Sequence, residues 1–139
     1  MRAIPLGAEG CFELHVSPEH LANRFKDPLL PPVLSTPVMI MAMENAALNA
    51  IRPYLEDGES AVGVAVDIRH LAATPLGFDI QATAEVVAIE GKRVLFKISA
   101  TDGIDEIGAG THQRVVIELP SFEKRLAEKQ FRRSHEVEA

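Results

Sequence analysis

The spacing of apolar residues changes from a helical period to a strand period near Ser60. Good helix formers fill "STPVMIMAMENAALNAIR", residues 35–52, and Pro37 stands where a first helical residue tolerates a missing N–H. Pro53 then indicates that the regular helix ends close by. The sequence therefore predicts one long, mostly apolar helix from Pro37 to Arg52.

After this helix, apolar and polar residues alternate as they do in half-buried strands. Four segments show the pattern, at 60–73, 78–90, 93–101 and 106–119, and "CFELHV" at 11–16 adds a strand before the helix. The turns "TPLG", "EGK" and "DGID" are short, so the strands they join are antiparallel neighbours. Since only the long helix is apolar enough to cover this sheet, we expect an α+β fold with an antiparallel five-stranded sheet wrapped around one central helix. In the first of these segments the period predicts one shared face for Val62, Val64, Val66, Ile68 and His70.

Composition limits the class of protein. With 139 residues, of which 47% are hydrophobic, the chain is expected to form a single domain, residues 1–139, with a core over about 10–120 and a charged C-terminal helix over about 121–131. The N-terminus has no continuous apolar segment, so we expect no secretory signal and a cytoplasmic location. The single cysteine, Cys11, excludes an intramolecular disulfide and a Cys-rich zinc site, and the net charge of −6 argues against a nucleic-acid partner.

Glu44 is the least expected residue of the helix. At 100° per residue it lies on the apolar face, among Ile40, Leu48 and Ile51. A lone ionised carboxylate in such a place costs several kcal/mol, so Glu44 must be paired, hydrogen-bonded, protonated or open to a cleft. A histidine is a natural partner, and we expect Glu44 to approach His70 closely.

Three other polar residues occupy positions that their local patterns would give to apolar or small ones. Thr36 serves equally well as a helix cap and as a functional hydroxyl. His70 ends a valine-rich strand face, where a lone histidine is more often a core residue bonded to the backbone. Arg114 fits a half-exposed salt bridge as well as a contact to an anionic ligand.

The glycines and the remaining histidines give weaker signals. Gly63 interrupts a run of β-branched residues, which indicates a bulge or a close backbone approach, and a backbone N–H at such a site can bind a carbonyl oxygen. The "GAG" of residues 108–110 does not open a helix, so it is no nucleotide-binding loop. His15 and His112 have no companions at ligand spacing, and we expect neither a metal site nor a cofactor.

Three long strings, "STPVMIMAMENAALNAIRPYLEDGES", "VGVAVDIRHLAATPLG" and "DGIDEIGAGTHQRVVIEL", resemble the fluoroacetyl-CoA thioesterase family of hotdog-fold acyl-CoA thioesterases. The resemblance extends from about Leu30 to Leu119. It implies a hotdog fold, a catalytic set of Thr36, Glu44 and His70, and contacts to the acyl thioester from Gly63 and Arg114. It also places Leu30 where the fluoroacetate specialist of the family carries a phenylalanine lid.

Together these features favour a homodimeric thioesterase that hydrolyses a small acyl-CoA, short-chain or fluoroacetyl, to the free acid and CoA. We expect a dimer because the sheet leaves open edges and the helix leaves an Asn45 and Asn49 face that a second copy could cover. Two alternatives remain open at this stage. A hotdog dehydratase or isomerase would use the same residues without releasing thiol, and a non-catalytic acyl-CoA binding module would bind without turnover.

Overall fold

The computed structural model describes residues 1–138. The predicted α+β class is confirmed, and the long helix and the strands lie within a few residues of the segments expected from the sequence. The elements are, in chain order, β1 (Glu9–His15), a 3₁₀ turn η1 (Pro18–His20), α1 (Ala22–Phe25), α2 (Thr36–Ile51), a 3₁₀ turn η2 (Arg52–Tyr54), β2 (Glu59–His70), β3 (Asp79–Glu90), β4 (Arg93–Thr101), β5 (Glu106–Glu118) and α3 (Leu119–Glu138).

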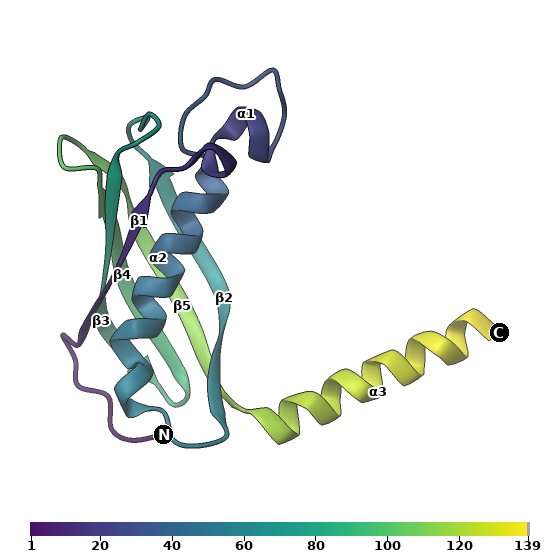
Figure 1. The fold of residues 1–139 in the computed structure, drawn as a ribbon. Coiled ribbons are helices and arrows are strands. Elements are labelled where there is room, and N and C mark those ends of the chain that lie inside the picture. The colour runs from purple at the N-terminus through teal and green to yellow at the C-terminus, as the bar shows by residue number, and fades with distance from the viewer. Residues whose placement is uncertain (139) are drawn as a thin grey trace.

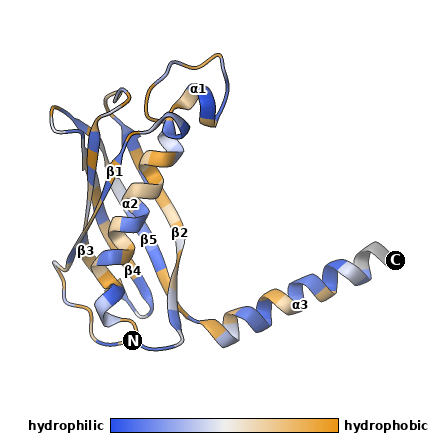
Figure 2. Cartoon of the chain, viewed as in Figure 1, coloured by the Kyte–Doolittle hydropathy of each residue, from blue (hydrophilic) through white to orange (hydrophobic). Residues whose placement is uncertain are grey.

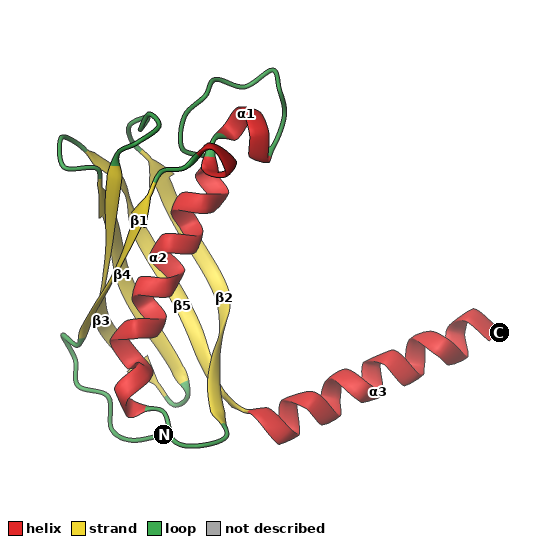
Figure 3. Ribbon diagram, in the orientation of Figure 1, coloured by secondary structure: helices red, strands yellow, loops and turns green. Residues whose placement is uncertain are grey.

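The five strands form one antiparallel sheet in the order β1-β3-β4-β5-β2. The β3–β4 hairpin turns at Gly91, whose φ of +63° lies in the left-handed region that favours glycine. The two edges are β1 and β2, and β2 exposes Val64 and Val66. Figure 3 shows the strands wrapped along α2, which is the expected hotdog arrangement.

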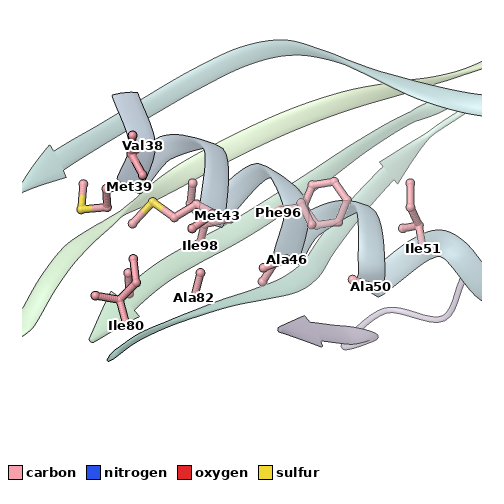
Figure 4. Close-up of a cluster of buried hydrophobic side chains, with 14 of the residues drawn as sticks. Val38, Met39, Met43, Ala46, Ala50, Ile51, Ile80, Ala82, Phe96 and Ile98 are labelled. Atoms are coloured by element: carbon pink, nitrogen blue, oxygen red, sulfur yellow. The ribbon is translucent and has the colours of Figure 1, made fainter. Parts of the chain in front are cut away.

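Small residues let α2 lie close against the sheet (Figure 1). A side chain at Gly10 of β1 would collide with the backbone of Ala46 and Ala50, so this glycine sets the distance between helix and strand. The centre of the core, in Figure 4, joins side chains of α2 to those of β3 and β4. Its labelled residues are Val38, Met39, Met43, Ala46, Ala50, Ile51, Ile80, Ala82, Phe96 and Ile98.

The polar side of α2 is partly used within the chain. The Asn49 side-chain amide donates to the Cys11 carbonyl oxygen of β1 at 2.9 Å, and Asn45 contacts the Met41 sulfur at 3.0 Å. Asn49 therefore helps to hold the β1 edge, which weakens the Asn45 and Asn49 face as a reason to expect a second copy there.

A bulge in β2 changes which side chains face α2. The register shifts between Gly63 and Ala65, so Val64 is an extra residue in β2. Val62 pairs with Val115 and Val66 pairs with His112, and these two partners lie three residues apart, on opposite faces of β5. The prediction of one common face from Val62 to His70 is therefore wrong.

The helix α3 is longer than the expected 121–131 and begins directly after β5, at Leu119. It projects away from the sheet (Figure 1), and apolar and polar residues are interspersed along it (Figure 2). At the other end, the packed body includes residues before the expected start at 10, because Ile4 is buried. Within residues 1–138, no helix is both long enough and apolar enough to cross a membrane.

Candidate active site

A pocket of about 430 Å³ opens at the N-terminal end of α2. Its walls come from α1, from the proline-rich loop before α2, from the first residue of α2 and from the residues that follow β2. Thr36, His70 and Leu30 all line it. Three residues that the sequence analysis selected therefore share one cavity, although 34 positions separate Thr36 from His70.

The Thr36 hydroxyl lies 2.8 Å from Nδ1 of His70. Ser35 is the N-cap residue of α2, and its side chain makes no capping hydrogen bond. Thr36 is the first helical residue, so its hydroxyl is turned to the histidine rather than used as a cap. The structure thus brings together two of the three residues expected to carry the chemistry.

His70 is half-buried, and this environment sets its protonation. Burial lowers the pKa of the His70 imidazole, and the backbone of Ala72 partly offsets that effect. Its Nε2 is buried and has no hydrogen-bond partner among the described residues. A neutral imidazole whose Nδ1 accepts from a hydroxyl has the properties of a general base.

Glu44 lies in a second cluster with Gly63, His112 and Arg114. A Cβ atom built on Gly63 would be 3.0 Å from Glu44 Oε2, 3.3 Å from His112 Cε1 and 3.8 Å from Arg114 Nη1. The bare Cα of Gly63 thus makes room for a carboxylate, an imidazole and a guanidinium at one point of the sheet.

Arg114 is 8% exposed, and its charge is held by neighbours on β2, β5 and α2. Nη2 donates to the Ala61 carbonyl oxygen at 2.7 Å, and Nη1 lies 3.3 Å from Nε2 of His112. Burial lowers the pKa of Arg114, and the negative charge of Glu44 opposes this effect. The half-buried Glu44 carboxylate therefore helps to stabilise the charge of the buried Arg114 guanidinium.

Within one chain, no hydrogen bond or salt bridge joins Glu44 to His70: His70 Nδ1 contacts Thr36, and Glu44 lies beside Gly63. Eight residues of α2 separate Glu44 from Thr36, which is about 12 Å along a helix. Seven residues of β2 separate Gly63 from His70, about 23 Å along a strand. The two clusters therefore lie at different points of the gap between α2 and β2.

The β2 bulge is the reason that both clusters face α2. Gly63 pairs with Arg114 and His70 pairs with Gly108, and these partners are six residues apart on the same face of β5. In a regular strand, two residues seven positions apart point to opposite faces. The extra residue Val64 removes that conflict.

His112 is the residue of the Glu44, Gly63 and Arg114 cluster that the sequence analysis missed. It was set aside because no metal ligands stand near it in sequence, and no group of residues that could hold a metal is found in the described part of the chain. The available signal was its spacing from Arg114, since residues two apart on a strand share a face.

Comparisons with known proteins agree with this geometry. Residues 16–119 match the model of the fluoroacetyl-CoA-specific thioesterase family. A fluoroacetyl-CoA thioesterase of Streptantibioticus cattleyicolor is 46% identical over 99 residues, which cover 71% of each chain.

Solved structures agree as well. A fluoroacetyl-CoA thioesterase superposes with a TM-score of 0.86 at 36% identity, covering 91% of this chain and 98% of the other. A thioesterase superfamily member of Thermus thermophilus gives a TM-score of 0.90 at 34% identity, covering 97% and 99%. The chain belongs to the fluoroacetyl-CoA-specific thioesterase family and is an acyl-CoA thioester hydrolase.

Proposed function

We propose that the substrate is a short-chain acyl-CoA and that Thr36 and His70 act on its thioester carbonyl. The observation that carries this proposal is the 2.8 Å contact between the Thr36 hydroxyl and His70 Nδ1 in the wall of a pocket. The pocket volume is about 430 Å³. If the pocket also takes the pantetheine end of CoA, the remaining space suits a small acyl group. Because CoA thioesters are metabolites of the cell interior, we also propose that the protein works in the cytoplasm.

In the proposed mechanism, His70 Nδ1 takes the proton of the Thr36 hydroxyl while Oγ1 bonds to the carbonyl carbon. The C–S bond then breaks, and CoA leaves as the thiol with the proton from His70. A water molecule, deprotonated by His70, then attacks the acyl carbon; the bond to Thr36 Oγ1 breaks, His70 returns its proton to Oγ1, and the acid is released. The direct contact between hydroxyl and imidazole supports this route over one in which His70 activates water at the first step.

We further propose that two copies complete the site through their β2 edges. Gly63 and His70 lie symmetrically about the Val66–Asp67 peptide, so antiparallel pairing of two β2 strands about that point would put Gly63 of one copy opposite His70 of the partner subunit. The Glu44, Gly63 and Arg114 cluster would then come to the unpartnered side of the other copy's His70. Exposed Val64 and Val66 supply the apolar surface for such pairing.

A panel of acyl-CoA thioesters with thiol detection tests the proposal. We expect CoA release with acetyl- and other short-chain thioesters, and loss of most of it in Thr36→Val and His70→Gln. Tight binding without thiol release would indicate the binding module, and conversion of the acyl group with the thioester intact would indicate the dehydratase or isomerase. Sedimentation at micromolar concentration tests the dimer, and a monomer with full activity would contradict the shared site.

A further inference from the structure

His112 is the most deeply enclosed of the charged or titratable groups around Gly63. Its side chain is 1% exposed, and its ring stacks on Phe96 of β4 with centroids 5.8 Å apart. It does not line the pocket that holds Thr36 and His70. Its role therefore has to be read from what its two nitrogens contact.

Those contacts fix one tautomer. Nδ1 lies 2.8 Å from the carbonyl oxygen of Ala65, and a carbonyl only accepts, so Nδ1 carries a proton. Nε2 lies 3.3 Å from Arg114 Nη1, and a guanidinium only donates, so Nε2 carries a lone pair. His112 is thus a neutral imidazole in its Nδ1–H form.

The two contacts join the bulge to the cluster. Arg114 holds the carbonyl oxygen of Ala61 and His112 holds that of Ala65, so the two side chains from β5 bind β2 on either side of Gly63 and Val64. At the same time His112 gives Arg114 an acceptor for a hydrogen that would otherwise be buried without one.

We propose that His112 is a positioning residue of the thioesterase: in its neutral Nδ1–H form it orients the Arg114 guanidinium beside Glu44 and Gly63 and holds the β2 bulge in place. The proposal rests on the function proposed above, in which the Glu44, Gly63 and Arg114 cluster of one copy completes the site around His70 of the partner subunit. His112 stands outside the proposed catalytic residues, because it acts through Arg114 and touches no reacting atom.

The surroundings favour the neutral form. Burial lowers the pKa of His112 and the Arg114 charge acts in the same direction, against the Ala65 carbonyl and the Glu44 carboxylate. The groups that face the ring are Glu44 from α2, Arg114 from β5, the Ala65 carbonyl from β2 and the uncharged Phe96 from β4. A proton on Nε2 would point at a guanidinium and break the contact.

The first experiment needs no substitution. Nitrogen-15 spectra of the imidazole of His112 in the intact protein at neutral pH should show a protonated Nδ1 and an unprotonated Nε2. Most neutral histidines carry the proton on Nε2, so this signature is diagnostic. An Nε2–H form, or a doubly protonated ring, would overturn the proposal whatever the protein hydrolyses.

The second experiment is a double-mutant cycle with His112→Asn and Arg114→Gln. The Asn side chain keeps a donor near Nδ1 and removes the acceptor for Arg114. We expect kcat/KM to fall by about tenfold to a hundredfold, the range set by losing a hydrogen bond to a charged group. In the Arg114→Gln background the same change should alter kcat/KM by less than about twofold, because the residue through which His112 acts is already gone.

Two further variants complete the design. His112→Gln, which keeps an acceptor near Nε2, should retain more activity than His112→Asn. His15→Gln is the matched control, since His15 is exposed on β1 at the opposite edge of the sheet. Losses that multiply in the double variant would overturn the proposal. A wild-type protein that releases no thiol would instead refute the proposed function, and the nitrogen-15 result would still decide the tautomer.

Discussion

Replacing Gly10 with alanine tests how closely α2 is held to the sheet. The added Cβ would lie 2.8 Å from the Cα of Ala50, and it would also collide with the backbone of Ala46. Carbon atoms in ordinary contact are separated by at least ~3.5 Å, so α2 or β1 must move by about 0.7 Å or more. These are backbone atoms, which cannot turn aside as the end of a flexible side chain can.

The expected cost follows from this displacement. Overpacking of a well-packed core costs about 1–3 kcal/mol, and a collision with a helix backbone belongs at the upper end of that range. Alanine also reduces the freedom of the unfolded chain, which returns about 0.4–1 kcal/mol. We therefore expect Gly10→Ala to lower the free energy of unfolding by about 2 kcal/mol.

Equilibrium urea denaturation at one fixed protein concentration measures this change. The matched control is Cys11→Ala, because the neighbouring Cys11 side chain is exposed and should change the free energy of unfolding by less than ~0.5 kcal/mol. If Gly10→Ala behaves like Cys11→Ala, then the close contact between α2 and β1 does not exist in solution, and the argument that Gly10 sets the distance between helix and strand fails with it.

Four further outcomes can be measured. Thr36→Val should lower kcat by at least about 100-fold while Thr36→Ser keeps measurable turnover, because only the hydroxyl contacts His70 Nδ1; equal rates for the two variants would exclude attack by Thr36. Glu44→Gln should reduce kcat/KM by more than it reduces thermal stability, since Glu44 faces Arg114 rather than the hydrophobic core; the reverse order would make Glu44 a structural ion pair. Burial opposes ionisation of Asp102, but hydrogen bonds from the backbone of Asp105 and Ile104 and from the Thr74 hydroxyl outweigh it and lower the pKa of Asp102. The stability that this carboxylate contributes is therefore present above its unfolded pKa of about 3.9 and is lost as the pH falls through the lower folded pKa. The difference in unfolding free energy between wild type and Asp102→Asn should shrink in acid. A difference that grew in acid would contradict the pKa argument. Finally, because Leu30 offers no aromatic lid, fluoroacetyl-CoA should be preferred over acetyl-CoA by less than about 10⁴-fold in kcat/KM when both are measured side by side, and a larger ratio would refute the lid argument.

The elements of the fold could be predicted from local signals. Alternation and turn residues placed the strand at 93–101 where the structure has β4, and proline at each end bounded α2 to within one residue. Alternation did not reveal the bulge, although Gly63 indicated either a bulge or a close backbone approach at this point of the strand. "VGVAVD" carries small or β-branched apolar residues on both faces, so an extra residue leaves no break in the pattern.

The site was predictable one residue at a time but not as pairs. Helical periodicity singled out Glu44, yet its neighbours depend on the register between β2 and β5, which sequence spacing does not give. His112 was missed for the same reason, because its significance comes from the Ala65 carbonyl across the strand pair. Only the family resemblance grouped Thr36 with His70, because their 2.8 Å contact depends on how α2 crosses the sheet.

The extra residue in β2 decides which face of the sheet His70 lies on, because side chains alternate between faces along a strand. Deleting Val64 would remove one exposed valine and leave every proposed catalytic residue in the sequence. If the strand then paired regularly, Gly63 and His70 would stand six positions apart and still share the face toward α2. Regular pairing with Val64 retained would instead turn His70 away from Thr36. With seven positions from Gly63 to His70, the bulge therefore decides whether His70 faces α2.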